Sequence, residues 1–252
     1  GGSGKTRLAI QAATDLIDSF ADGVWWVELA ALTAAEQVAR AVAKALGVVE
    51  RPHEDVLTAI TTFLGDKELL LVIDNCEHLV AASADLVTAL LSRCPHLQIL
   101  TTSREALHVA GELTWQVPTL ALPNPQQVVL TDLLLQFECI RLFVERASAV
   151  QPDFRLTLDN APAVVALCTQ LDGIPLAIEL AAARVKVLPV AQIAGRLSSA
   201  IGARFALLTQ GSRTVLPRHQ TLRAAIDWSY DLLDAAERHL FRLVAIFHGG
   251  FT

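Results

Sequence analysis

Residues 1–6 read GGSGKT, and this glycine-rich loop stands directly before a segment with helical periodicity. Leu8, Ala12 and Leu16 recur at every fourth residue, which predicts a helix from Lys5 to Ser19. Glycine permits a tight concave backbone whose N–H groups converge on an anion, and a helix N-terminus adds its free N–H groups and positive dipole end. The spacing matches the last six positions of G-x-x-x-x-G-K-[ST], so a polyphosphate site is predicted here.

Each residue type in this loop has a predicted role in holding a nucleotide. We expect Lys5 to reach the β- and γ-phosphates as a point charge, and the Thr6 hydroxyl is suited to bind Mg²⁺. A glycine-rich start without a binding role is the alternative, and agreement with a second site argues against it. The predicted nucleotide-binding residues of the loop are Gly1, Gly2, Ser3, Gly4, Lys5, Thr6 and Arg7.

The second site follows the apolar segment LLLVI at residues 69–73. Such a run is typical of a strand covered on both faces of a parallel sheet, and it delivers Asp74 to the edge where ligands bind. In nucleotide-binding sheets an acid at this place holds Mg²⁺, usually through water. A cap for the next helix, or a residue that shapes the turn, is the alternative. With the glycine loop present, Thr6 and Asp74 are the predicted magnesium ligands.

The residues just after Asp74 bear on hydrolysis. Glu77 can orient or deprotonate an attacking water, and it can equally be a solvated turn residue. Asn75 occupies the position where many fast ATPases carry a second acid, which predicts slow hydrolysis. Cys76 and His78 have a C-x-H spacing without a matching second pair, so no metal site is expected from them.

A third polar site ends the predicted strand from Gln98 to Thr102. We expect Thr102, Ser103 and Arg104 beside the phosphates, where an arginine can sense or stabilise the γ-phosphate. An ion pair from Arg104 to Glu105 or to another acid is the alternative. The predicted catalytic residues are therefore Lys5, Asp74, Glu77 and Arg104.

Strands and helices alternate through the first half of the chain, which predicts a doubly wound α/β fold with a parallel sheet. Thr33 and Glu36 are expected to form a capping box, and Gly47 to end that helix. We expect the strand before the glycine loop, and the first two positions of its pattern, to precede residue 1. The predicted strands are 24–29, 69–73, 98–102 and 114–117, and the predicted helices are 5–19, 34–46, 54–64 and 79–93.

Three prolines between residues 118 and 127 predict a linker, and only helices are predicted beyond it. These helices span 131–149, 160–171, 175–187, 190–199, 221–233 and 234–247, with a loop at 211–218.

Composition limits the partners of the chain. Although 53% of the residues are hydrophobic and the mean hydropathy is +0.44, the apolar runs are far shorter than the ~20 residues that span a bilayer. The net charge is −6 and the arginines are scattered, which argues against direct contact with nucleic acid. The four cysteines lack metal-ligand spacing and suit a reduced, cytoplasmic protein. Because the sequence has no Met, we expect it to be a segment of a longer protein.

The motifs, taken in order, resemble the STAND class of P-loop NTPases, which is close to NB-ARC domains. They read GGSGKTRLA, VWWVELA, LLLVIDNCEHL, ILTTSREAL, LDGIPLAIELAAAR and TLRAAIDWSYDLL. The nearest likeness is to the ATPase module of large bacterial transcriptional regulators of LuxR and AfsR type. The resemblance implies a P-loop NTPase core at 1–122, a helical subdomain at 123–210 and the start of a winged-helix subdomain at 211–252.

The resemblance also assigns two residues of the helical part to the nucleotide. Gly173 and Pro175 resemble the G-x-P motif of the family, whose proline packs on the adenine and ribose. The residues alone indicate that Gly173 ends one helix and Pro175 begins the next.

The function implied by the resemblance is an ATP- and ADP-binding switch with Mg²⁺ as its metal. Bound ADP would hold a resting state, and exchange for ATP would let the module rearrange or form a homo-oligomer. Slow hydrolysis would reset it, and the output would pass to linked effector or sensor domains. The alternatives are a working ATPase of the AAA+ kind, a scaffold that does not use nucleotide and, more weakly, a small-molecule kinase.

Overall fold

The structure is a computed structural model, and it describes residues 2–49, 54–124, 131–198, 230 and 233–244. The chain divides into two compact units. Gly4–Gln116 form the first, which we call the α/β unit, and residues 117–252 with 1–3 form the second, the helical unit. The domain boundaries predicted at residues 122 and 210 stay predictions, since the second lies outside the described residues.

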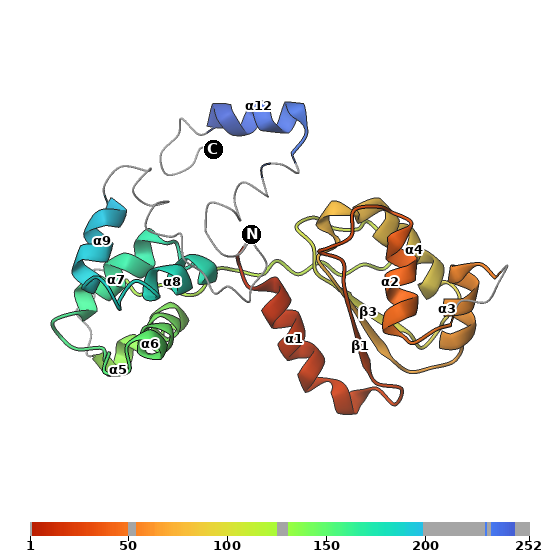
Figure 1. Cartoon of the computed structure of the whole chain (residues 1–252), viewed down its shortest axis with the longest axis horizontal. Coiled ribbons are helices and arrows are strands. Elements are labelled where there is room, and N and C mark those ends of the chain that lie inside the picture. The colour runs from red at the N-terminus through yellow and green to blue at the C-terminus, as the bar shows by residue number, and fades with distance from the viewer. Residues whose placement is uncertain (1, 50–53, 125–130, 199–229, 231–232, 245–252) are drawn as a thin grey trace. The chain divides into compact units, whose positions relative to one another are not determined.

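The α/β unit alternates helices and strands as predicted (Figure 1). Its elements are α1 (Lys5–Asp15), η1 (Ile17–Ser19), β1 (Val24–Glu28), α2 (Gln37–Ala45), α3 (Val56–Leu64), β2 (Leu70–Asp74), η2 (Cys76–His78), α4 (Val80–Leu91) and β3 (Gln98–Thr101).

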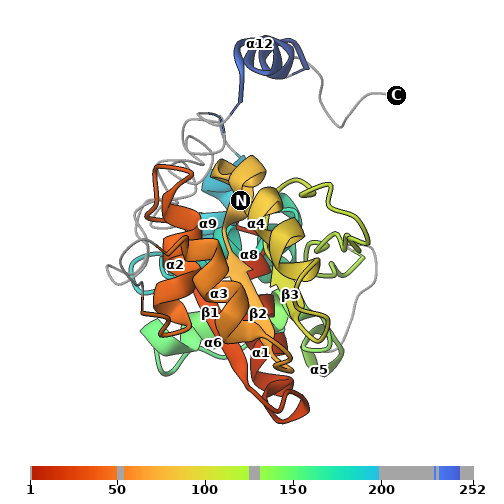
Figure 2. The ribbon, with the colours of Figure 1, turned by 90° about the vertical axis from the view of Figure 1, so that its right-hand side faces the viewer.

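The sheet of this unit has three described strands in the order β1-β2-β3, and both pairs are parallel. All five residues of β2 are buried because helices cover both of its faces. Leu71 and Ile73 pack with residues of α2, α3 and α4, whereas Leu70 and Val72 pack against α1. Figure 2 shows α2, α3 and α4 on one side of the strands. The predicted parallel α/β fold is therefore confirmed.

Side chains determine where two helices of this unit begin. Asp55 caps α3, because its carboxylate accepts a hydrogen bond from the Thr58 N–H at 3.2 Å. The predicted capping box of Thr33 and Glu36 is wrong. Instead, the Gln37 side chain reaches back and accepts from the Thr33 N–H at 3.0 Å, since residues 34–36 form a turn before the helix.

The predicted strand at residues 114–117 is also wrong, because these residues have no regular secondary structure. These residues do not pair with the outer edge of β3, which has no strand partner within the described part of the chain. Trp115 in this segment is 67% exposed, so its apolar side chain is not buried against a sheet.

Among the described residues of the helical unit, the helices between residues 131 and 198 share one apolar core. Phe143 and Phe154 pack edge to face in that core, with ring centroids 5.9 Å apart. The helix predicted at 131–149 is divided by a turn at 135–137, and the one predicted at 175–187 ends at Ala182. The described elements of the unit are α5 (Thr131–Leu134), α6 (Glu138–Val150), α7 (Ala161–Gln170), α8 (Pro175–Ala182), α9 (Val190–Ser198) and α12 (Ala235–Val244).

Most of the predicted winged-helix segment lies outside the described residues. The loop at 211–218 is not described, nor is nearly all of the helix predicted at 221–233. Among the helices that are described, none has the length and apolar character needed to cross a membrane.

Candidate functional site

The candidate site lies in the α/β unit, where β2 and β3 end. β2 is apolar until its last residue, Asp74, whose side chain is buried with only 2% of the residue exposed. Residue 102 directly follows β3, and parallel pairing brings the carboxyl ends of the two strands to the same edge of the sheet. The strand pattern therefore delivers a buried carboxylate to the edge where ligands bind in such sheets.

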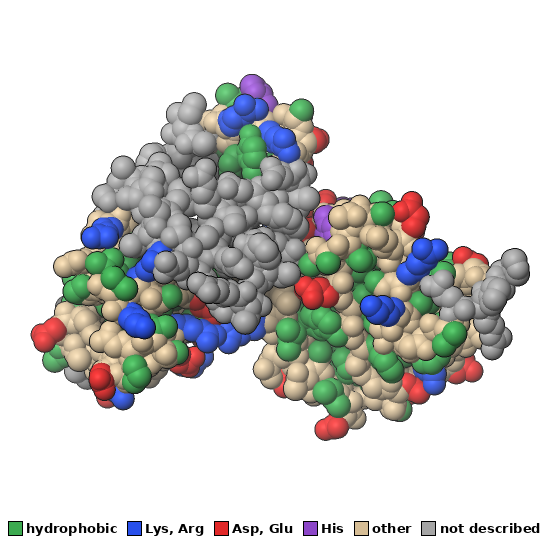
Figure 3. Space-filling model, viewed as in Figure 1, with side chains coloured by type: hydrophobic (Ala, Val, Ile, Leu, Met, Phe, Trp, Pro, Cys, Tyr) green, Lys and Arg blue, Asp and Glu red, His purple; other side chains and the backbone are tan. Residues whose placement is uncertain are grey.

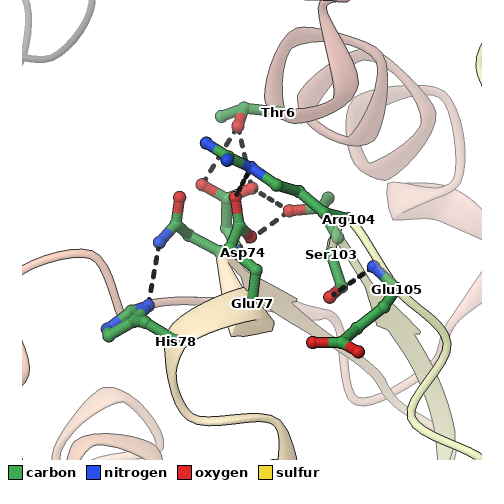
Figure 4. A network of polar contacts seen from close by, with 9 residues as sticks. Thr6, Asp74, Glu77, His78, Ser103, Arg104 and Glu105 are labelled. Atoms are coloured by element: carbon green, nitrogen blue, oxygen red, sulfur yellow. Dashed lines mark hydrogen bonds and ion pairs between the residues drawn. The ribbon is translucent and has the colours of Figure 1, made fainter. Parts of the chain in front are cut away.

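Asp74 accepts hydrogen bonds from two hydroxyl groups that come from different elements (Figure 4). The Thr6 Oγ1 on α1 donates to the carboxylate, at 2.9 Å from Oδ1 and 3.2 Å from Oδ2. The Thr102 Oγ1 donates to Oδ1 by a short hydrogen bond. We call these three side chains the Asp74 network. It brings together two residues, Thr6 and Asp74, that the sequence predicted as magnesium ligands.

Thr102 binds the end of β2 through main chain and side chain alike. Its Oγ1 accepts from the Asn75 N–H at 2.9 Å, and its own N–H donates to the Ile73 carbonyl at 3.0 Å. Its carbonyl accepts from the Cys76 N–H at 2.9 Å. The sequence placed Thr102 beside the phosphates but did not include it among the site residues. The sequence signal that could have identified Thr102 as a site residue is its place as a polar residue at the end of a strand, as Asp74 is at the end of β2.

Glu77 and Arg104 form an ion pair beside this network, with Arg104 Nε 3.2 Å from Glu77 Oε1 (Figure 4). Only 7% of the Glu77 side chain is exposed, compared with 23% for Arg104. The interpretation of Glu77 as a solvated turn residue is therefore wrong. The ion pair considered for Arg104 exists, although its partner is Glu77 rather than Glu105. Within the described residues, Glu77 Oε2 is buried and has no hydrogen-bond partner.

The glycine loop has the backbone conformation that its residue types predict. Gly2 and Gly4 have φ of 82° and 90°, in the left-handed region that glycine enters at no steric cost. Helix α1 begins at Lys5, and the Leu8 N–H donates to the Gly4 carbonyl at 2.9 Å. Lys5 is partly exposed and Arg7 is exposed, while Gly1 lies outside the described residues. Phosphate binding by Ser3 and the rest of the loop stays a prediction.

In the helical unit, Gly173 precedes α8 and Pro175 is its first residue. Gly173 has a φ of 66°, and a Cβ at this position would lie 2.3 Å from the Leu120 carbonyl oxygen. The Leu176 N–H donates to the Gly2 carbonyl at 3.2 Å, and a Cβ on Gly2 would lie 2.9 Å from the Leu176 Cβ. Glycine is thus required at both positions for steric reasons. Contact of Gly173 and Pro175 with a nucleotide stays a prediction.

The donor atoms at the network suit Mg²⁺. Thr6 and Asp74 offer a hydroxyl and a carboxylate within hydrogen-bond distance of each other, and Mg²⁺ takes few protein oxygens and keeps several waters. No cluster of three or more His, Cys, Asp or Glu residues capable of holding a metal occurs in the described ranges. Burial raises the pKa of the nearby Cys76 thiol to about 12, so this thiol is neutral at ordinary pH and is a poor metal ligand.

Comparison with known proteins shows what the chain is similar to. Residues 1–119 match the NB-ARC domain. A Mycobacterium tuberculosis protein named as an HTH-type transcriptional regulator is 46% identical over the whole chain, which covers 26% of that protein. An uncharacterised protein of the same organism is 41% identical, and the chain covers 59% of it. Streptomyces griseus regulatory protein AfsR is 28% identical, and the chain covers 24% of it.

The chain therefore spans between about a quarter and three fifths of the length of these relatives. The matched family agrees with the glycine loop, the buried acid after β2 and the parallel sheet. NB-ARC domains bind nucleotides, and the relatives named for their role are regulators. The chain carries an NB-ARC-like P-loop NTPase domain, a nucleotide-binding module of the kind that occurs in large regulatory proteins.

Proposed function

We propose that this chain is a switch that binds ATP and ADP with Mg²⁺, hydrolyses ATP slowly and regulates domains linked to it. The Asp74 network is the observation that carries the proposal. Asp74 is only 2% exposed, so its carboxylate has a high desolvation cost, which the two hydroxyl donors offset. A purely structural turn does not require a buried charge at the ligand-binding edge of the sheet, next to the helix that follows a glycine loop.

Each residue of the site has a proposed role. Gly2, Ser3 and Gly4 bind phosphate oxygens through the backbone, and Lys5 neutralises the β- and γ-phosphates. Thr6 and Asp74 hold Mg²⁺, which when bound screens the charge of the phosphates. The remaining contacts follow the family resemblance: Arg7 binds near the phosphates, and Gly173 and Pro175 lie against the adenosine.

The pairing of Glu77 with Arg104 supports a resting arrangement. A γ-phosphate competes with Glu77 for the guanidinium group, because both are anions that accept its hydrogen bonds. When Arg104 turns to the phosphate, the Glu77 carboxylate loses its partner and can orient the attacking water. ADP has no γ-phosphate and leaves the ion pair intact. The two nucleotides would therefore favour different arrangements of the same two side chains.

Slow hydrolysis follows from the residues next to Asp74. Asn75 cannot accept a proton from the attacking water as a second carboxylate at this position would. A long-lived ATP state suits a regulator that must signal to linked effector or sensor domains, and homo-oligomerisation in that state is part of the same proposal.

On the face of the described surface in Figure 3, the basic side chains are interspersed with acidic and apolar ones.

The proposal is tested by the metal dependence of binding. We expect Asp74→Ala to weaken ATP binding in Mg²⁺ by roughly ten-fold or more, while ADP binding without Mg²⁺ changes much less. Asp85→Ala is the matched control, because Asp85 is exposed on α4. Isothermal titration of each variant with both nucleotides gives the four affinities. Equal losses for the two nucleotides would exclude the metal role of Asp74.

A further inference from the structure

His78 connects the ends of two strands through its imidazole ring. Its Nε2 lies 3.0 Å from the Leu29 carbonyl oxygen and 3.1 Å from that of Leu32, in the segment after β1. Its Nδ1 lies 3.2 Å from the side-chain Nδ2 of Asn75, which directly follows Asp74. The ring therefore reaches from the end of β1 to the residue next to the candidate metal ligand.

The partners determine which ring nitrogen carries the proton. A carbonyl oxygen can only accept, so Nε2 must be the protonated nitrogen, shared between two carbonyl groups. In the neutral ring, Nδ1 is then an acceptor. The Asn75 side chain has one hydrogen-bond donor, the amide NH₂ group, and this group donates to Nδ1. His78 thus orients the Asn75 amide with its nitrogen toward the ring and its Oδ1 on the opposite side.

The backbone of Asn75 is held as firmly as its side chain. Its N–H donates to the Thr102 Oγ1, and its φ of 69° lies in the left-handed region that asparagine enters more readily than most residues. Only 7% of the residue is exposed. A buried amide with a fixed backbone and a fixed orientation presents its oxygen in one direction.

We propose that His78 is a positioning residue that makes Asn75 a hydrogen-bond acceptor for the water that attacks the γ-phosphate. This inference rests on the proposed function. The Asn75 amide oxygen can orient such a water but cannot remove its proton, so His78 acts through Asn75 on the rate of hydrolysis. Because the ring contacts Asn75 and two main-chain carbonyls, its loss affects turnover more than nucleotide affinity.

Two substitutions separate this role from a structural one. Leu in place of His78 fills a similar volume but removes both polar atoms. Gln retains a donor for the carbonyls of Leu29 and Leu32 and an acceptor for the Asn75 amide. We expect His78→Leu to slow single-turnover ATP hydrolysis by roughly ten-fold or more, with ATP affinity changed by less than about three-fold. We expect His78→Gln to recover most of the rate.

A second measurement determines the tautomer of His78 in the absence of nucleotide. In the nucleotide-free chain, ¹⁵N chemical shifts of the His78 ring should show a neutral imidazole protonated on Nε2. A ring protonated on Nδ1 would overturn the inference, and so would a His78→Leu variant that hydrolyses ATP at the wild-type rate. A wild-type chain that binds no ATP would instead refute the proposed function, and with it the role in catalysis, whatever the tautomer.

Discussion

Replacement of Thr102 by Val tests whether the Asp74 network stabilises the α/β unit. The two side chains have nearly the same shape, so the substitution removes a hydroxyl without leaving a cavity. It deletes the hydrogen bond to the buried Asp74 carboxylate and leaves the buried Asn75 N–H without its acceptor. A hydrogen bond to a charged group contributes about 1.5–3 kcal/mol, and an unsatisfied buried donor costs about 1–3 kcal/mol.

With partial relaxation, we expect Thr102→Val to lower the free energy of unfolding by roughly 3 kcal/mol. Thr102→Ser keeps the hydroxyl and loses one buried methyl group, so about 1 kcal/mol is expected for it. Urea unfolding followed by tryptophan fluorescence reports mainly on this unit, because three of the four tryptophans, Trp25, Trp26 and Trp115, belong to it. If Thr102→Val lowered the free energy of unfolding no more than Thr102→Ser does, the Thr102 hydroxyl would not stabilise the Asp74 network.

Further predictions concern other parts of the chain. Gly173→Ala should lower the free energy of unfolding of the helical unit by roughly 2 kcal/mol or more, because the added Cβ would meet the Leu120 carbonyl oxygen at a positive φ. Gly195→Ala in α9 should be neutral or slightly stabilising, because nothing lies within 4 Å of the added Cβ. Thermal unfolding of both variants measures the difference. Burial raises the pKa of the Cys76 thiol from 9.0 to about 12, so the contribution of the neutral thiol to stability is complete below pH 9 and is lost toward pH 12. Between pH 9 and pH 12, the free energy of unfolding of the wild type should therefore fall more steeply than that of Cys76→Ala. Asp55→Ala should destabilise α3 by about 1 kcal/mol through loss of its cap, measurable by hydrogen exchange in that helix.

The sequence predicted the elements whose pattern is local. The apolar run of β2 is recognisable because both faces of the strand are covered, and the position of Asp74 follows directly from where that run ends. The glycine loop was equally clear, since glycines at this spacing before Lys-Thr and a helix are typical of a phosphate-binding loop. These two features were enough to predict the sheet edge at which the site lies.

The features that the sequence missed depend on distant parts of the chain. The segment at 114–117 has strand-like composition, but whether such a segment pairs with a sheet edge depends on its tertiary packing, which composition does not reveal. The ion pair of Glu77 with Arg104 joins residues that are 27 positions apart, so either could have paired elsewhere. The polar contacts of Thr102 are likewise set by its strand neighbour and could be inferred only once the order of β2 and β3 was known.

The central claim is that the glycine loop holds a nucleotide. It is tested most directly by equilibrium titration of the chain with ADP and with ATP and Mg²⁺, for the wild type and for Lys5→Ala. We predict one nucleotide bound per wild-type chain and none detectable for Lys5→Ala, while Lys44→Ala, which removes an exposed lysine of α2, binds as the wild type does. A wild-type chain that binds neither nucleotide, or a Lys5→Ala variant with unchanged affinity, would contradict the claim.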